Sequence, residues 1–264
     1  MVEGGSTIVQ GNLVKLSKAH GLRHQSISIN HLIQPLGNST ASDPSLATGN
    51  NEKVDPQFTD YIIGVQFKDA TEEWIRDDTY LYTARVVTEA IRFKVAVVMK
   101  LKGSNDEQVE SIRCNLNDIA QNYRLEIETW MDEFIAVPHF GYLMSSIADY
   151  SRKSVIRAKI LGLIKEKGYV TLEKCEEKNG GILIFVHQRD AADEIYFRIQ
   201  WSVRFVTKYW SALHFFAIDS VQADEEFVAA NETLLQTFCK KGVDKDELEE
   251  LWNTLCLNIE HHKK

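Results

Sequence analysis

The stretch Glu194–Val206, EIYFRIQWSVRFV, shows the cleanest alternation of side-chain types in the chain. Large apolar residues occupy every second position from Ile195 to Phe205, and polar or charged residues occupy most positions between them. Because successive side chains of a β-strand point to opposite faces, this pattern predicts a strand with one face in the core. Burial on one face only is typical of an antiparallel sheet.

The segments around this stretch extend the sheet and add helices to it. Asn179-Gly180-Gly181 predicts a hairpin turn. The other strands predicted for this sheet are Tyr169–Cys175, Ile182–His187 and Trp210–Asp219. The helices predicted before and after these strands are Phe140–Glu166, Glu225–Cys239 and Asp244–Ile259. Asp244 is expected to cap the last helix, because its carboxylate can accept a hydrogen bond from the backbone N–H of Glu247.

The first half of the chain repeats this order. From Ile91 to Leu101, apolar side chains alternate with positions that include Arg92, Lys94 and Lys100, which predicts a half-buried antiparallel strand. The further strands predicted in this half are Ser26–Ile33, Phe58–Lys68, Tyr80–Thr88 and Val109–Leu116. The predicted helices are Thr7–His20 and Ile119–Ala136.

The order of these elements decides the fold class and the domain organisation. Strands that form a block between helices indicate an α+β fold, not the regular alternation of a parallel sheet. The order occurs twice, and the long helix Phe140–Glu166 can end the first copy and open the second. We therefore expect two tandem α+β domains, residues 1–138 and 139–264. Residues 35–56 contain three of the four prolines and predict a mobile loop in the first domain.

Composition excludes several classes of protein. The chain has 264 residues, of which 44% are hydrophobic, so it can bury a core. Its net charge of −8 argues against general binding to nucleic acid or anionic membranes, which requires clustered Lys and Arg. Four widely spaced cysteines predict a reduced, intracellular protein. The sequence has no apolar run near the ~18–20 residues of a membrane span and no secretory signal at its start.

Motifs for catalysis or cofactor binding are absent from the sequence. It contains no G-x-x-x-x-G-K-[ST], G-x-G-x-x-G, G-x-S-x-G or H-E-x-x-H pattern. His20 and His24 lie four residues apart, but Gly21 interrupts the helix that would align them for a metal. His187 and His214 fall on predicted strands, where packing or hydrogen bonding is the simpler role. We therefore expect no catalytic residues, no metal and no cofactor.

Two features are candidates for binding a protein partner. Residues 140–168 carry six Lys and Arg against two acidic residues, which predicts either a solvated helix face or a site for an acidic partner. The last two strands are rich in aromatic residues, and a strand cannot bury both faces against one helix layer. Part of these rings should therefore lie on a less protected face and mark an interface. The residues expected to contact a partner are Arg152, Lys153, Arg157, Tyr209, Trp210, Phe215 and Phe216.

The element order resembles two copies of the RWD fold, in which a helix is followed by an antiparallel meander and closing helices. Three segments resemble the centromere protein P family of tandem-RWD proteins: LVKLSKAHGLRH (Leu13–His24), Ala84–Asp118 and TLLQTFCKKGVDKDELEELWNTLC (Thr233–Cys256). The last shares the family's leucine-rich helix, Gly-Val, acidic helix, leucine and cysteine. The chain departs from the family in having no coiled-coil segment before the first predicted helix and no aligned motif in loop 35–56.

This resemblance implies a non-catalytic structural subunit of the inner kinetochore, located at the centromere in the nucleus. It would form a heterodimer with centromere protein O and dock proteins like centromere proteins Q, U and R for chromosome segregation. RWD folds are related to ubiquitin-conjugating enzymes, but no His-Pro-Asn stands near a cysteine here. Two alternatives stay open. One is a different RWD adaptor, such as a centromere protein O-like partner or a ubiquitin-pathway binding module. The other is an enzyme that pairs His187 or His214 with a carboxylate.

Overall fold

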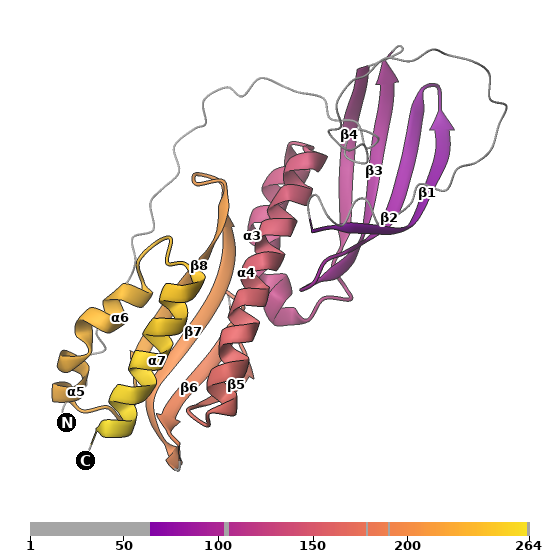
Figure 1. Cartoon of the computed structure of the whole chain (residues 1–264). Coiled ribbons are helices and arrows are strands. Elements are labelled where there is room, and N and C mark those ends of the chain that lie inside the picture. Colours follow the sequence, from indigo (N-terminus) through magenta and orange to yellow (C-terminus); the bar gives the residue numbers. More distant parts are fainter. Residues whose placement is uncertain (1–63, 103–105, 178, 190, 263–264) are drawn as a thin grey trace, which may run out of the picture. The chain divides into compact units, whose positions relative to one another are not determined.

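The computed structural model describes residues 64–102, 106–177, 179–189 and 191–262 (Figure 1). The predicted helix Thr7–His20, the predicted strand Ser26–Ile33 and the predicted loop 35–56 lie outside these residues.

The described chain is a mixed α+β protein with two four-stranded antiparallel sheets, so the predicted α+β class is confirmed. In each sheet the strands follow one another as a meander, β1-β2-β3-β4 and β5-β6-β7-β8. The strands are β1 Gln66–Arg76, β2 Thr79–Val87, β3 Arg92–Lys102, β4 Asp106–Asn115, β5 Val170–Lys174, β6 Ile182–Gln188, β7 Ala191–Val206 and β8 Ser211–Ser220. The described helices are α3 Gln121–Ala136, α4 Phe140–Glu166, α5 Glu225–Ala230, α6 Glu232–Phe238 and α7 Lys245–His261.

The described residues group into two compact units. Residues 64–118 and 133–148 form the unit of the first sheet, and residues 119–132 and 149–262 form the unit of the second sheet. The sequence suggested a division after residue 138, whereas the first part of α3 groups with the second sheet. Both α3 and α4 therefore contribute residues to both units.

The first sheet is built on β3, whose predicted alternation is confirmed. Phe93, Val95, Val97 and Met99 are all buried. Of the strand predicted over Phe58–Lys68, residues 58–63 lie outside the described residues, and only Gln66–Lys68 belongs to the edge strand β1. This strand runs on to Arg76 through a stretch that the sequence pattern did not predict as a strand. Its side chains beyond the first two are exposed on both faces, so no alternation is needed there.

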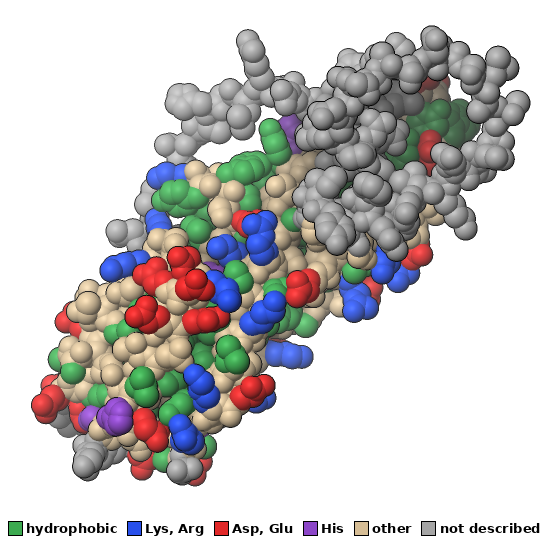
Figure 2. Space-filling model, in the orientation of Figure 1, with side chains coloured by type: hydrophobic (Ala, Val, Ile, Leu, Met, Phe, Trp, Pro, Cys, Tyr) green, Lys and Arg blue, Asp and Glu red, His purple; other side chains and the backbone are tan. Residues whose placement is uncertain are grey.

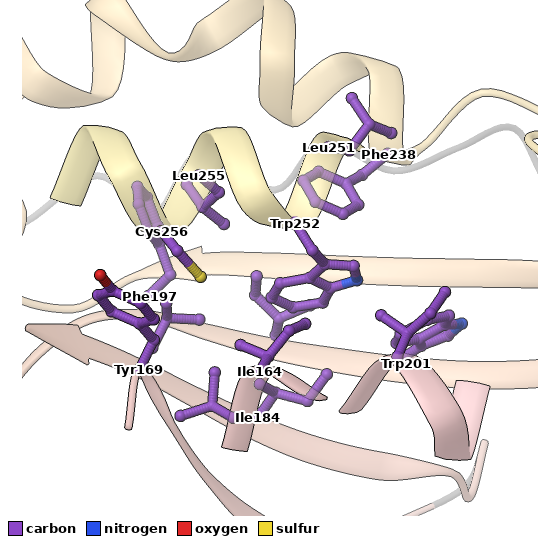
Figure 3. Close-up of a cluster of buried hydrophobic side chains, with 14 of the residues drawn as sticks. Ile164, Tyr169, Ile184, Phe197, Trp201, Phe238, Leu251, Trp252, Leu255 and Cys256 are labelled. Atoms are coloured by element: carbon purple, nitrogen blue, oxygen red, sulfur yellow. The ribbon is translucent and has the colours of Figure 1, made fainter. Parts of the chain in front are cut away.

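The core of the second unit covers one face of the second sheet (Figure 3). Trp201 of β7 stacks on Trp252 of α7, with ring centroids 5.8 Å apart. Trp252 also meets the edge of Phe238 at 5.1 Å, and Ile164 of α4 lies in the same cluster. Helices α4, α6 and α7 thus pack on the apolar face predicted for β7.

The end of the chain differs from prediction in one respect and agrees in another. The single helix predicted over Glu225–Cys239 is wrong, because the chain breaks into α5 and α6 at the buried residue Asn231. The Asn231 amide donates to the Phe227 carbonyl at 2.9 Å and its Oδ1 accepts from Asn258 of α7 at 2.7 Å. A side chain held in this way competes with the helix backbone. The predicted cap of α7 is confirmed, since Asp244 accepts from the Glu247 N–H at 2.9 Å.

Candidate functional site

The turn between β7 and β8 presents two aromatic side chains to solvent. Tyr209 is 46% exposed and Trp210 is 42% exposed. Trp210 has φ = 52°, a left-handed backbone conformation that is strained for a bulky residue. Its ring meets the edge of Phe205 at 5.6 Å. Backbone strain of this kind clusters at functional sites, so the half-exposed Trp210 makes this turn a candidate binding surface.

Two lysine side chains lie close to the ring of Tyr209. The ammonium groups of Lys208 and Lys241 lie 5.6 Å and 5.3 Å from the centre of its ring. Lys241 Nζ also donates to the Tyr209 hydroxyl at 3.3 Å. This hydrogen bond and the charges of both lysines lower the pKa of Tyr209. The turn therefore combines apolar ring surface with positive charge.

Asp149 of α4 holds the start of β8, directly after Trp210. Its Oδ2 accepts from the Ala212 N–H at 2.6 Å and from the Ser211 hydroxyl at 3.1 Å. Its Oδ1 lies 3.7 Å from Arg152 Nη2, and the Arg152 side chain is 70% exposed. Asp149 thus connects one predicted partner residue, Arg152, to the strand that begins beside Trp210. We call Arg152, Lys208, Tyr209, Trp210 and Lys241 the turn cluster.

The other predicted aromatic pair is divided between the two faces of the sheet. Phe216 packs into the core, with ring centroids 4.8 Å from Trp201 and 5.3 Å from Phe238. Phe215 lies on the opposite face, where the guanidinium carbon of Arg204 is 4.9 Å from its ring centroid. Only Phe215 of this pair is therefore placed to meet a partner.

Arg157 is buried, so the expectation that it lies on an exposed basic face is wrong. Its side chain is 1% exposed and forms an ion pair with Glu126, which is fully buried. The two Arg157 nitrogens Nη1 and Nη2 lie 2.5 Å and 3.0 Å from the two Glu126 oxygens. The Tyr150 hydroxyl donates to the same carboxylate at 2.6 Å. Burial disfavours the charged guanidinium, but the Glu126 carboxylate outweighs that effect and raises the pKa of Arg157.

This ion pair completes the hydrogen bonding of β7 where its neighbour β6 begins. The pairing of β6 with β7 reaches only as far as Ile182 opposite Trp201. Beyond it, the Val203 N–H donates to Glu126 at 2.7 Å and Arg157 Nη1 donates to the Trp201 carbonyl at 2.9 Å. Buried backbone groups must find partners, and here the charged side chains replace a strand. The role of Arg157 is therefore structural.

Lys153 is half-buried, and its positive charge lowers the pKa of His214 of β8. The Trp201 indole N–H donates to His214 Nδ1 at 3.1 Å, which requires a neutral imidazole with its proton on Nε2. Burial and, to a smaller extent, the positive charges of Lys153 and Arg157 together lower the pKa of His214 to about 3. Because His214 is held neutral and accepts a hydrogen bond from Trp201, its role is in packing. His187 bonds instead to the Gln188 carbonyl at 2.8 Å and to Thr171 at 3.3 Å.

All four cysteines lie in the described residues and are free thiols. Burial raises the pKa of Cys114 and of Cys256 to about 12. It also raises the pKa of Cys175 and Cys239. Because the thiolate is the reactive form, these thiols are poor nucleophiles at neutral pH.

Comparisons with known proteins do not assign the chain to a family. No protein-family model matches it, and no curated protein matches its sequence. No helix in the described residues is long and apolar enough to cross a membrane. The part of the chain that the structure describes also contains no group of three or more His, Cys, Asp or Glu side chains placed to hold a metal ion.

Two important residues were missed by sequence reasoning. Glu126 sits on an apparently ordinary helix, and only its i,i+4 neighbours Asn122 and Trp130, both buried, signal that its face points inward. For Arg204, the alternation in Glu194–Val206 predicts only a place on the polar face of β7. Its place over Phe215 depends on the register between β7 and β8, which sequence alone does not supply.

Acidification should destabilise the protein through His214. The unfolded imidazole takes up a proton below pH ~6.5, whereas the folded one stays neutral down to pH about 3, so stability falls as the pH is lowered between these values. From pH 7 to pH 5 we expect the free energy of unfolding to fall by about 2 kcal/mol from this residue. Urea unfolding at both pH values measures this fall in the free energy of unfolding. In His214→Asn the fall should be smaller by that amount, and an equal fall in both proteins would contradict the assignment.

Proposed function

We propose that the chain is a non-catalytic, tandem-RWD subunit of the inner kinetochore. It pairs with a second tandem-RWD protein resembling centromere protein O and docks subunits resembling centromere proteins Q, U and R. It acts at the centromere, in the nucleus, in chromosome segregation. The observation that carries the proposal is the order of the described elements. Two four-stranded antiparallel meanders are each followed by helices, and α4 stands between the two sheets in the sequence.

The surface of the second unit supports a protein-binding role. On the face seen in Figure 2, Lys and Arg are interspersed with Asp and Glu, and apolar side chains lie between them. Mixed charges of this kind do not form the continuous basic patch that a polyanion requires. The turn cluster instead offers exposed Tyr and Trp rings and the exposed Arg152, which are residue types enriched at protein interfaces.

The experiment that tests the proposal is purification of the tagged chain from dividing cells, with the co-purifying proteins quantified by mass spectrometry. We expect stoichiometric recovery of a centromere protein O-like partner and its neighbouring subunits. Recovery of ubiquitin-conjugating enzymes in their place would favour the alternative, an RWD adaptor of the ubiquitin pathway. A monomer with no partner would contradict both functions.

Replacing Trp210 with alanine should weaken partner binding without unfolding the chain. Central aromatic residues of an interface typically contribute 2 kcal/mol or more, so recovery of the partner should fall at least about tenfold. Because the ring is half-exposed, we expect the melting temperature to fall by no more than about 3 °C. Trp210→Gly, which relieves the left-handed backbone strain, should bind as poorly and be no less stable than the alanine variant.

The matched control is Trp74→Ala, at the β1–β2 turn of the first unit. Trp74 is 61% exposed but has no lysine pair around its ring among the described residues, and its indole N–H donates to the Asp77 carbonyl at 2.7 Å. Its removal should leave recovery of the partner unchanged. If Trp74→Ala reduced recovery and Trp210→Ala did not, the turn cluster would be the wrong surface. A large fall in melting temperature for both Trp210 variants would show that this side chain belongs to the core.

A further inference from the structure

The second sheet has an outer face, opposite the core, with an unusual mixture of side chains. The core uses alternate residues of β7 such as Phe197, Ile199 and Trp201. The residues between them point the other way, as do those paired with them on the neighbouring strands. The outer face carries half-buried apolar and aromatic residues beside two arginines. These residues are Leu183, Phe185, Leu213, Phe215, Arg198 and Arg204.

The two arginines of the outer face differ in their partners. Arg198 donates to Asp219 of β8 through Nε and Nη2, at 3.1 Å and 2.7 Å. Arg204 has no carboxylate partner among the described residues. Its Nη2 donates to the Ser202 hydroxyl at 3.3 Å, and its Nε is shielded from solvent without a hydrogen-bond partner in this part of the chain. Arg204 is therefore a cation without a paired anion among the described residues, held in a fixed position.

The position of Arg204 is set by its neighbours. The guanidinium carbon lies 4.9 Å from the ring centroid of Phe215, and Arg204 pairs with Leu213 in the register of the sheet. Burial lowers the pKa of Arg204, and the charge of Glu126 opposes that effect only in part. A partly desolvated cation without a paired anion is unfavourable, and an incoming carboxylate would remove that penalty.

We propose that the outer face around Arg204, Leu213 and Phe215 binds a protein segment in which an Asp or Glu lies beside apolar side chains. The planar guanidinium can hold a carboxylate by two parallel hydrogen bonds. Leu213 and Phe215 would bury the apolar neighbours of that carboxylate. A nucleic acid is disfavoured as the occupant, because it requires several clustered cations and the chain carries a net charge of −8. The inference rests on the proposed protein-binding role, but not on the kinetochore as its setting.

The test uses the purified full chain and a random twelve-residue peptide library displayed on phage. Selection on the wild-type protein should enrich Asp or Glu next to Leu, Ile or Phe. Selection on Arg204→Gln should lose this enrichment, and selection on the control Arg198→Gln should keep it. Enrichment of basic or purely apolar peptides, no enrichment at all, or equal enrichment on Arg204→Gln would overturn the proposal.

The most enriched peptide is then synthesised with a fluorescent label and its affinity measured by polarisation. We expect Arg204→Gln to weaken binding at least tenfold and Arg204→Lys to weaken it less, because lysine keeps the charge but not the planar pair of donors. A peptide with Asn or Gln in place of Asp or Glu should also bind at least tenfold more weakly. Tighter, Arg204-dependent binding of a labelled single-stranded oligothymidine would instead assign the face to nucleic acid.

The two proposals can fail separately. Acidic peptides that bind through Arg204 while no kinetochore protein co-purifies would retain the surface and reject the setting. Kinetochore subunits that co-purify equally with wild type and Arg204→Gln, combined with no peptide selection, would retain the setting and reject this surface.

Discussion

Glu126→Gln should lower the free energy of unfolding by about 3–5 kcal/mol. The substitution leaves Arg157 as a buried cation without its anion, in a side chain that is 1% exposed. It also weakens the acceptor of the Tyr150 hydroxyl and of the Val203 N–H at the edge of β7. The measurement is urea unfolding monitored by circular dichroism. The loss should appear as a lower midpoint, with an unchanged dependence of the unfolding free energy on urea concentration.

Two further variants separate the buried charge from the general effect of substitution. The double variant Glu126→Gln/Arg157→Met removes both charges and should recover a large part of the stability lost in Glu126→Gln. Arg198→Gln breaks the ion pair with Asp219, and both side chains of this pair are about half-exposed. The substitution should therefore change the free energy of unfolding by less than about 1 kcal/mol. A loss below 1 kcal/mol for Glu126→Gln would show that the ion pair is not as thoroughly desolvated as the structure has it.

Trp252→Ala should cost about 3–5 kcal/mol of unfolding free energy, through the cavity it leaves. Trp252 is fully buried and contacts the rings of Trp201 of β7 and Phe238 of α6, so helix α7 loses both contacts. Thermal unfolding measured by calorimetry checks this result.

The matched control is Trp252→Phe. The indole N–H of Trp252 has no hydrogen-bond partner among the described residues. Phenylalanine keeps most of the apolar contact and removes that buried donor, so the loss should stay below about 2 kcal/mol. Equal losses for the two variants would mean that the contacts of the aromatic ring contribute little, contrary to the packing seen here.

The sequence predicts the fold best where burial is one-sided. Strands β3 and β7 and the helix α4 were predicted within a few residues, since each has a regular apolar face. The second part of β1 was missed, because the side chains of an edge strand that is exposed on both faces show no alternation. The break at Asn231 was missed because it depends on a hydrogen bond from Asn258, far along the chain.

The candidate site was predictable in composition but not in arrangement. The strand pattern predicted one exposed ring in the pair Tyr209–Trp210, whereas both rings are exposed, and Arg152 is the exposed cation that the basic helix predicted. Arg157 looked equivalent to Arg152 because both belong to one basic helix. Only the partner Glu126, on another helix, distinguishes the buried cation from the exposed one. The register that places Arg204 over Phe215 is likewise a property of strand pairing and not of either strand alone.

The grouping of residues 119–132 with the second sheet has a consequence during protein synthesis. Glu126 is made 77 residues before Val203, to whose N–H it will bond. At about 5–20 residues per second, that gap is roughly 4–15 s. Throughout it, the buried Trp130 lacks Phe205 of β7, whose ring centroid lies 5.7 Å from its own in the folded protein. The apolar side of this nascent helix therefore stays without its final partners for that time, and slow translation just after it would prolong the exposure.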